Sequence, residues 1–296
     1  MSEQRVALTK RIQQDLDPVE LSEPDYVTVL KLVFHVAVSV LREKPGQILA
    51  SAFVLLMAWG FHGNLDLLKL VVPDYRGPGV DLGHRPQLIP GIPWDDELIS
   101  FAGGLVLVVL VPMLLIRVVY RDSWANYGLG LPPKGRRSLA VWAFFTLTAL
   151  SLPAFYLGAQ DASMRMVYPL YRPFASGLEF AVYELTYLPF FIAIEFIFRG
   201  YLLFGLESVR GDNVRAAAGG GPAPYFFGKY ALLIQMLSYT AWHLGKPLPE
   251  LWGTLVWGIA AGATAWAVRS IWPVVLSHWL LNIFLDLMIL RSQGGI

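Results

Sequence analysis

The chain has 296 residues, of which 55% are apolar and only 15% are charged, with a formal net charge of +1 and a mean hydropathy of +0.51. Soluble domains carry about 25% charged residues, so this composition argues against a soluble protein and predicts a helical protein that crosses a membrane several times. The near-neutral charge gives no electrostatic basis for binding nucleic acid, and a chain without cysteine has no disulfide and no thiolate to attack a substrate or hold a metal.

The N-terminal quarter is predicted to hold one full membrane span. Residues 1–26 are polar and form a predicted tail without a signal-peptide core, in which a short helix from Arg5 to Leu16 is expected. Val27–Leu41 is apolar over too short a distance to span and is expected to lie along the bilayer surface. We expect the first span from Ile48 to about Val72, followed by a Pro- and Gly-rich loop over 73–97.

The middle of the chain is predicted to contain two spans, Leu98–Ile116 and Leu139–Leu157, joined by a basic loop. Positively charged loops stay in the cytoplasm, so we expect residues 117–137 to face that side. Five basic residues carry this prediction: Arg117, Arg121, Lys134, Arg136 and Arg137.

The second half is predicted to hold four more spans, which bring the total to about seven in an all-α fold. Leu178–Leu206 comes first and is kinked or divided at Pro189, and a flexible basic loop over 207–228 follows it. The remaining spans are expected at 230–243, 251–268 and 271–290. We therefore divide the chain into a tail (1–26), N-terminal spans and loops (27–177) and a C-terminal membrane domain (178–290) that holds the functional site.

Two ionisable residues interrupt the apolar run from Pro189 to Leu206. Glu195 and Arg199 stand four residues apart, so their side chains lie one above the other on a helix and can form an ion pair. An ionisable group inside a membrane span is energetically costly and indicates a functional site. The simpler alternative is a structural ion pair that locks two helices together.

Two other apolar stretches carry polar residues at the same four-residue spacing. Tyr239 and His243 form one such pair, and His278 and Asn282 form the other. Asp286 extends the second face by one more turn. A structural role also fits each pair alone, but their occurrence in separate spans favours one site sheltered from lipid.

A carboxylate, two imidazoles and an amide in such a site can activate a water molecule and stabilise the oxyanion that forms on a peptide carbonyl. The same groups can instead bind a metal ion, with zinc as the candidate and Glu195, His243 and His278 as candidate ligands. Between the two, the metal-free mechanism is favoured, because the amide of Asn282 is a better oxyanion donor than a ligand. Serine chemistry has less support, because no oxyanion-hole motif accompanies the serines near the histidines.

In their order and spacing these motifs resemble the CAAX protease and bacteriocin-processing family of intramembrane proteases, which includes the endopeptidase that trims prenylated Ras-type proteins. The resemblance covers about residues 178–290, roughly the last 40% of the chain. The family motifs are Glu-Glu-x-x-x-Arg, Phe-x-x-x-His and His-x-x-x-Asn. The matching positions are Glu195, Arg199, His243, His278 and Asn282, and Tyr239 replaces the phenylalanine.

One position departs from the family motif. The resemblance implies that the first glutamate of the pair activates water together with the first histidine, but Ile194 stands there. The preferred substitute is Glu195, followed by Glu250, which a short loop separates from His243. The other carboxylates considered are Asp286 and Glu184, which lies about 16 Å before Glu195 along a helix axis.

The predicted spans also place the two histidines at different depths in the membrane. They place His243 towards the external end of its helix and His278 nearer the cytoplasmic end of its own, about 15 Å apart along the axis. Either the helices tilt strongly or the predicted helix end near His243 is misplaced. We favour the misplaced helix end.

The resemblance implies an intramembrane endopeptidase that cleaves a membrane-associated protein or peptide, such as a prenylated CAAX tail or a bacteriocin leader, in the plasma (inner) membrane of a prokaryote. Its expected partners are membrane lipid and that substrate. The alternative is a family member that has lost its base at Ile194 and acts as a membrane binding or immunity protein. A transporter ranks third, because the sequence shows no inverted repeat.

Overall fold

The computed structural model describes residues 26–60, 67–79, 87–207 and 227–294, and the regular structure in these ranges is helical throughout. The all-α prediction is therefore confirmed. The chain divides into two compact units, residues 1–50 and residues 51–296. The predicted N-terminal tail with its short helix, and most of the predicted loop over 207–228, lie outside the described residues.

The first unit contains helix α2 (Tyr26–Arg42) and the start of α3 (Lys44–Trp59). Several apolar side chains of α2 are exposed; Tyr26, Leu30 and Phe34 are exposed by 92%, 68% and 72%. A helix forms where the sequence predicts one, and its placement along the bilayer surface stays a prediction.

The predicted span from Ile48 to about Val72 is wrong in its second half. Helix α3 ends at Trp59, and a separate short helix, α4 (Leu68–Val71), follows. Gly60 adopts a positive φ of 43°, which a right-handed helix does not continue. The apolar composition of this stretch therefore led to a predicted span that continues past Gly60, where the backbone turns.

Five helical segments of the described chain are long and apolar enough to cross a membrane. They are Asp95–Val119 (α5, Asp95–Gly104; η1, Leu105–Leu110; α6, Val111–Leu114; η2, Leu115–Val119), Lys134–Gln160 (η4, Lys134–Arg136; α7, Arg137–Gln160), Gly177–Glu207 (α9, Gly177–Glu195; η5, Phe196–Phe204; α10, Gly205–Glu207), α13 (Leu248–Val268) and α14 (Trp272–Ser292). The predicted count of about seven is not confirmed. Helix α3, with 16 residues, and α12 (Tyr230–Trp242), with 13, are shorter than the roughly 20 residues that a span requires.

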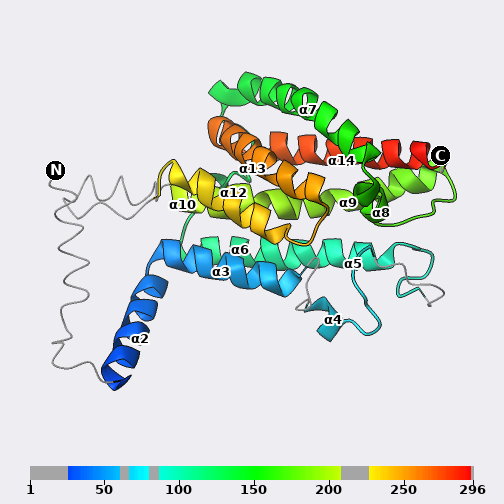
Figure 1. Cartoon of the computed structure of the whole chain (residues 1–296). Helices are drawn as coiled ribbons and strands as arrows, with labels where there is room; N and C mark the ends of the chain where they lie inside the picture. Colours follow the sequence, from blue (N-terminus) through cyan, green and yellow to red (C-terminus); the bar gives the residue numbers. More distant parts are fainter. Residues whose placement is uncertain (1–25, 61–66, 80–86, 208–226, 295–296) are drawn as a thin grey trace. The chain divides into compact units, whose positions relative to one another are not determined.

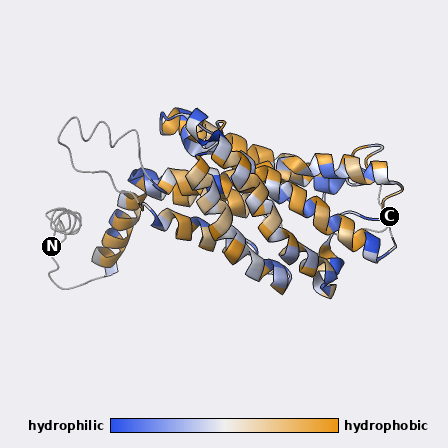
Figure 2. Cartoon of the chain, turned by 90° about the horizontal axis from the view of Figure 1, so that it is seen from above, coloured by the Kyte–Doolittle hydropathy of each residue, from blue (hydrophilic) through white to orange (hydrophobic). Residues whose placement is uncertain are grey.

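Within the second unit the long helices run side by side (Figure 1). Helix α14 packs along α7, α12 packs against α13 and η5, and α9 packs against α5. Short elements connect them: η3 (Trp124–Tyr127) in the basic loop and α8 (Ala162–Val167) after α7. Apolar residues predominate along these helices (Figure 2), as expected for a helical membrane protein.

The segment α9–η5 lies at the core of this unit. The side chain of Ser176 caps α9 by accepting a hydrogen bond from the backbone of Glu179, and the helix continues through Pro189 without a break. Pro189 therefore does not divide the segment. At Phe196 the helix widens into the π-helix η5, in which every residue is buried. Such π-helical turns often occur at functional sites.

Candidate active site

Residues from four separate segments converge on one cavity of about 400 Å³ in the second unit. Its lining includes Tyr168, His243, Glu250, His278 and Asn282, from the α8–α9 connection, the end of α12, the start of α13, and α14. A smaller adjoining cavity of about 40 Å³ shares all five of these residues, and Ile194 also lines it. The structure thus brings together both predicted histidines, the predicted asparagine and Glu250.

The short helix α12 explains how the two histidines meet. Its 13 residues rise only about 20 Å, and His243 follows directly after its last residue. His243 is buried, with 7% of its surface exposed, so it does not lie at an exposed helix end. The two histidines line the same cavity without the axial mismatch that the predicted span boundaries produced.

Glu195 is fully buried and does not line either cavity. Its Oε1 lies 2.6 Å from Nδ1 of His278 and accepts a 3.3 Å hydrogen bond from Nε1 of Trp257. Its Oε2 lies 3.2 Å from Nε of Arg199. Both carboxylate oxygens therefore face protein groups, and Glu195 fixes the ring of His278.

Arg199 completes this buried group. It is fully buried in η5, and its guanidinium lies 4.0 Å from the centre of the Tyr239 ring. A cation over an aromatic face is stabilised by the ring quadrupole, and more strongly where water is excluded. Tyr239, at the position of the family's phenylalanine, thus supports the charge that neutralises Glu195.

His243 presents one free ring nitrogen to the cavity. Its Nδ1 donates a 2.8 Å hydrogen bond to the backbone carbonyl of Tyr239, because a carbonyl can only accept. Its Nε2 then carries the lone pair, 3.8 Å from Oε1 of Glu250. Burial lowers the pKa of His243 to about 3, so the ring is neutral at physiological pH and can accept a proton.

Glu250 lies in the first turn of α13 and has two partners that the sequence analysis did not identify. Its Oε1 accepts a 2.8 Å hydrogen bond from the Tyr168 hydroxyl, and Nζ of Lys246 lies 3.7 Å away. Lys246 also donates a 2.9 Å hydrogen bond to Tyr168. The other carboxylate oxygen, Oε2, has no hydrogen-bond partner in the described part of the chain. A lysine three residues after His243 was a visible signal for this group, whereas Tyr168 had none.

Asn282 lies one helical turn before Asp286 on α14. Its Nδ2 donates a 3.1 Å hydrogen bond to Oδ2 of the fully buried Asp286, so one of its two amide hydrogens is engaged within α14. Asp286 and Glu184 do not line the cavity. Asp286 therefore orients the amide of Asn282.

The proposed zinc ligands do not form a metal site. Glu195 contacts His278 and Arg199, while Nε2 of His243 faces Glu250. Across the described ranges, no group of three or more His, Cys, Asp or Glu side chains is arranged to hold a metal ion.

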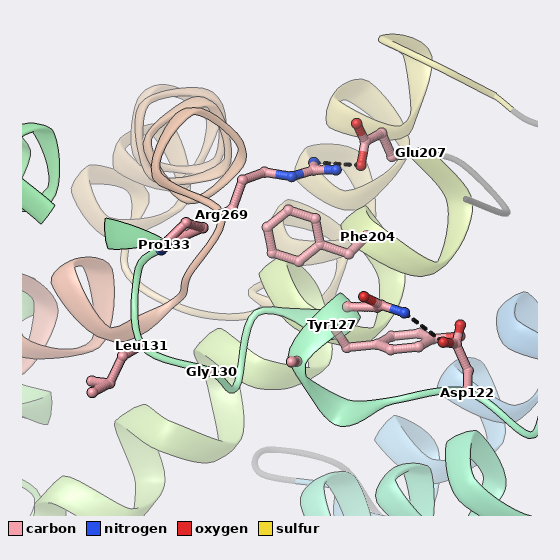
Figure 3. Close-up of a pocket in the computed structure, with 10 residues that line it drawn as sticks. Asp122, Tyr127, Gly130, Leu131, Pro133, Phe204, Glu207 and Arg269 are labelled. Carbon is pink, nitrogen blue, oxygen red and sulfur yellow. Dashed lines mark hydrogen bonds and ion pairs between the residues drawn. The ribbon is translucent and has the colours of Figure 1, made fainter. Parts of the chain in front are cut away.

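A second cavity, of about 240 Å³, lies beside the ends of η5 and α13 (Figure 3). Glu207 accepts a 2.6 Å hydrogen bond from Arg269, and Asp122 accepts a 2.6 Å hydrogen bond from Asn126. Trp266 also donates to Glu207. Each acidic group of this cavity is held by a neighbour, so the cavity is a weaker candidate for catalysis than the first.

Residues 177–284, a little over a third of the chain, match a protein-family profile described as type II CAAX prenyl endopeptidase, Rce1-like. The match confirms the resemblance to the CAAX protease and bacteriocin-processing family. It also supports an integral membrane protein with a protease function in general, in agreement with the five long apolar helices. No curated protein and no solved structure matches the chain.

Proposed function

From the place of residues 177–284 in the CAAX protease family, we propose that the chain is an intramembrane endopeptidase with its protease domain at 178–290. It hydrolyses a peptide bond of a membrane-associated protein or peptide by means of a water molecule. One observation supports the proposal above all: His243, Glu250, His278 and Asn282 line one cavity within the helical bundle.

His243 and Glu250 activate the water. Nε2 of His243 and the carboxylate of Glu250 are both acceptors, and the 3.8 Å between them is too long for a direct hydrogen bond. A water molecule between these two acceptors donates one hydrogen to each of them. A lone pair of the water oxygen then points towards a substrate carbonyl. General-base assistance of this kind contributes about 10²–10⁴-fold to the rate.

His278 and Asn282 stabilise the oxyanion. His278 donates from Nδ1 to Glu195, so its Nε2 is the ring atom left for the substrate. A ring that carries a hydrogen on Nε2 as well donates that hydrogen to the oxyanion. Asn282 adds the amide hydrogen that Asp286 leaves free. Prearranged donors at a developing oxyanion commonly supply the largest part of catalysis in acyl transfer.

These roles differ from the preferred sequence hypothesis, in which Glu195 is the base. The geometry favours Glu250, because Glu195 lies outside the cavity and both of its oxygens are engaged by Arg199, His278 and Trp257. Glu195 then acts as the residue that orients His278. Glu250 supplies the carboxylate that the family motif places at Ile194.

The cavity walls favour an apolar substrate segment. Phe155, Val256 and Leu285 line the cavity together with Trp252. Trp252 and Val256 are exposed by 65% and 72%, so one rim of the cavity lies at the outer surface of the bundle. A membrane-anchored C-terminal tail or leader peptide in a prokaryotic plasma membrane is the substrate that such a rim can receive from the bilayer.

The experiment is a cleavage assay with the full chain in liposomes that carry a membrane-tethered fluorogenic peptide. The wild type should turn over, and His243→Ala should lower kcat by about 10²–10⁴-fold because the water loses one acceptor. His35→Ala in α2 is the matched control and should retain activity. A wild type without turnover on CAAX-type and leader-type peptides alike would contradict the proposal.

The alternative function, a membrane binding or immunity protein, has one specific observation in its favour. Ile194 lies against the smaller cavity with 1% of its surface exposed, so an apolar side chain stands where the family motif has its base. If this alternative holds, the wild type binds the peptide without cutting it, and Ile194→Glu creates turnover. If Glu250 is the base, Ile194→Glu lowers turnover by adding a second buried charge.

A further inference from the structure

An apolar groove of about 560 Å³ lies between the first turns of α7 and the start of α14. It shares no lining residue with the candidate active-site cavity. Its walls include Val141, Phe144, Phe145 and Leu276, and its only charged lining residue is Arg137. The groove is therefore a separate apolar site with one charged lining residue.

The walls of the groove belong to the membrane-facing surface of the bundle. Val141 and Phe145 are exposed by 56% and 58%, and Leu276 by 44%. Only 17% of the most apolar stretch of Lys134–Gln160 is buried within the protein. The groove consequently opens towards the hydrocarbon of the bilayer, which supplies its occupant.

The positive charge at the head of the groove is not neutralised by a neighbouring carboxylate. Arg137 and Lys134 are exposed and make no ion pair with a described residue, whereas Arg136 donates a 2.5 Å hydrogen bond to the carbonyl of Ala267. No Asp or Glu occurs between Asp122 and Asp161 in the sequence. Within the described part of the chain, this end of the groove thus offers two cations without an ion-pair partner to an anion.

The neighbouring cavity does not supply the missing negative charge. Leu131 lines both the groove and that cavity, whose Glu207 is already paired with Arg269 (Figure 3). The carboxylate of Glu207 therefore already has a partner within the protein. Among the described residues, Lys134 and Arg137 therefore have no carboxylate as a partner.

The polar and apolar ends of the groove are spaced as in a membrane lipid. Arg137 and Phe145 are eight residues apart on α7, about 12 Å along its axis. Trp272 also lines the groove and donates a 3.0 Å hydrogen bond from its indole to the backbone carbonyl of Leu129. Tryptophan and basic side chains are typical of the headgroup level, and phenylalanine and valine of the hydrocarbon.

We propose that this groove binds one anionic phospholipid, drawn from the leaflet on the side of the loop 117–137. The phosphate lies against Arg137 and Lys134, and one acyl chain follows Val141, Phe145 and Leu276. Charge-assisted hydrogen bonds fix the headgroup, and the free apolar walls receive the chain. This lipid site is independent of the proposed peptidase activity.

The test uses the full chain in nanodiscs of phosphatidylglycerol or of phosphatidylcholine with the same acyl chains, followed by native mass spectrometry after transfer to detergent. The wild type should retain one phosphatidylglycerol in preference to phosphatidylcholine. The double variant Lys134→Gln, Arg137→Gln should weaken this retention by roughly 10- to 30-fold, as expected for two lost basic contacts. The control, Arg117→Gln with Arg121→Gln, removes the same charge from the same loop outside the groove and should retain the lipid.

Three outcomes of the lipid-retention measurements would overturn the proposal. Equal retention of the two lipids would show that the headgroup charge is not recognised. Equal losses in the two double variants would show a diffuse attraction of the loop rather than a site. Release of the lipid by inorganic phosphate alone would show that the cations bind free phosphate. Val141→Trp, which fills the groove without altering the charge, should displace the lipid, and conversion of dimers to monomers by this variant would identify a second copy of the chain as the occupant instead.

Discussion

Two segments of the second unit, Gly177–Glu207 and Lys134–Gln160, have the same mean hydropathy over their most apolar stretches, yet 83% of the first stretch is buried within the protein and only 17% of the second. The first carries Glu195 and Arg199 at its centre, whereas α7 has no charged residue after Arg137. Hydropathy thus identifies both as membrane segments but does not distinguish a core helix from a lipid-facing one. The ionisable residues make that distinction, because they cannot face hydrocarbon without a large cost.

The largest expected effect in this comparison follows from breaking the buried ion pair. Arg199→Ala leaves the charge of Glu195 buried without its cation and removes the contact of the guanidinium with Tyr239. We expect the free energy of unfolding to fall by about 3–5 kcal/mol, as measured by denaturant titration of the full chain in mixed micelles. Arg117→Ala, at an exposed position, is the matched control, and equal losses in the two variants would contradict the distinction between core and surface.

A smaller effect is expected from adding one methyl group to each region. A Cβ at Gly200 in η5 would lie 2.9 Å from the backbone oxygen of Tyr127 and 2.5 Å from the ring of Phe196, and the backbone atom cannot move aside. A Cβ at Gly135, just before α7, meets no atom within 4 Å.

Gly200→Ala should therefore lower the free energy of unfolding by about 1–3 kcal/mol, and Gly135→Ala should change it by about 0.5 kcal/mol or less. The same mixed-micelle titration measures both. A Gly200→Ala protein as stable as the wild type would show that the backbone of Tyr127 and η5 are not in close contact.

The smallest effect is expected on the outer face of α7. Leu150 is 77% exposed, so Leu150→Ala removes a side chain that lipid contacts in both the folded and the unfolded state. We expect a change of about 0.5 kcal/mol or less in the free energy of unfolding. A loss of several kcal/mol would indicate that a second protein surface covers this face.

Much of this architecture was accessible from the sequence, because each long helix is predominantly apolar and the four-residue spacing of polar groups marks their inward faces. The intrahelical pairs Glu195–Arg199 and Asn282–Asp286 follow from that spacing alone, and both contacts occur in the structure. The end of α3 was missed, because Gly60 turns the backbone within an apolar stretch.

The partner of His243 was harder to predict. Glu250 approaches it only because α12 is short and a five-residue connection, 243–247, returns the chain into the bundle. Tyr168, the other contact of Glu250, lies 82 residues away in sequence. No periodic pattern in the sequence encodes such a contact, because the contact depends on how separate helices pack.

The central claim is that water is activated at Glu250 and His243 rather than at Glu195. The most direct test measures kcat for Glu250→Gln and Glu195→Gln in the same liposomes, against the same membrane-tethered peptide, with the free energy of unfolding as a control for folding. The account predicts a loss of about 10²–10⁴-fold for Glu250→Gln and a smaller loss for Glu195→Gln, because the amide oxygen still accepts the hydrogen bond from His278. Full activity of Glu250→Gln, together with loss of turnover in a folded Glu195→Gln protein, would contradict it and restore Glu195 as the base.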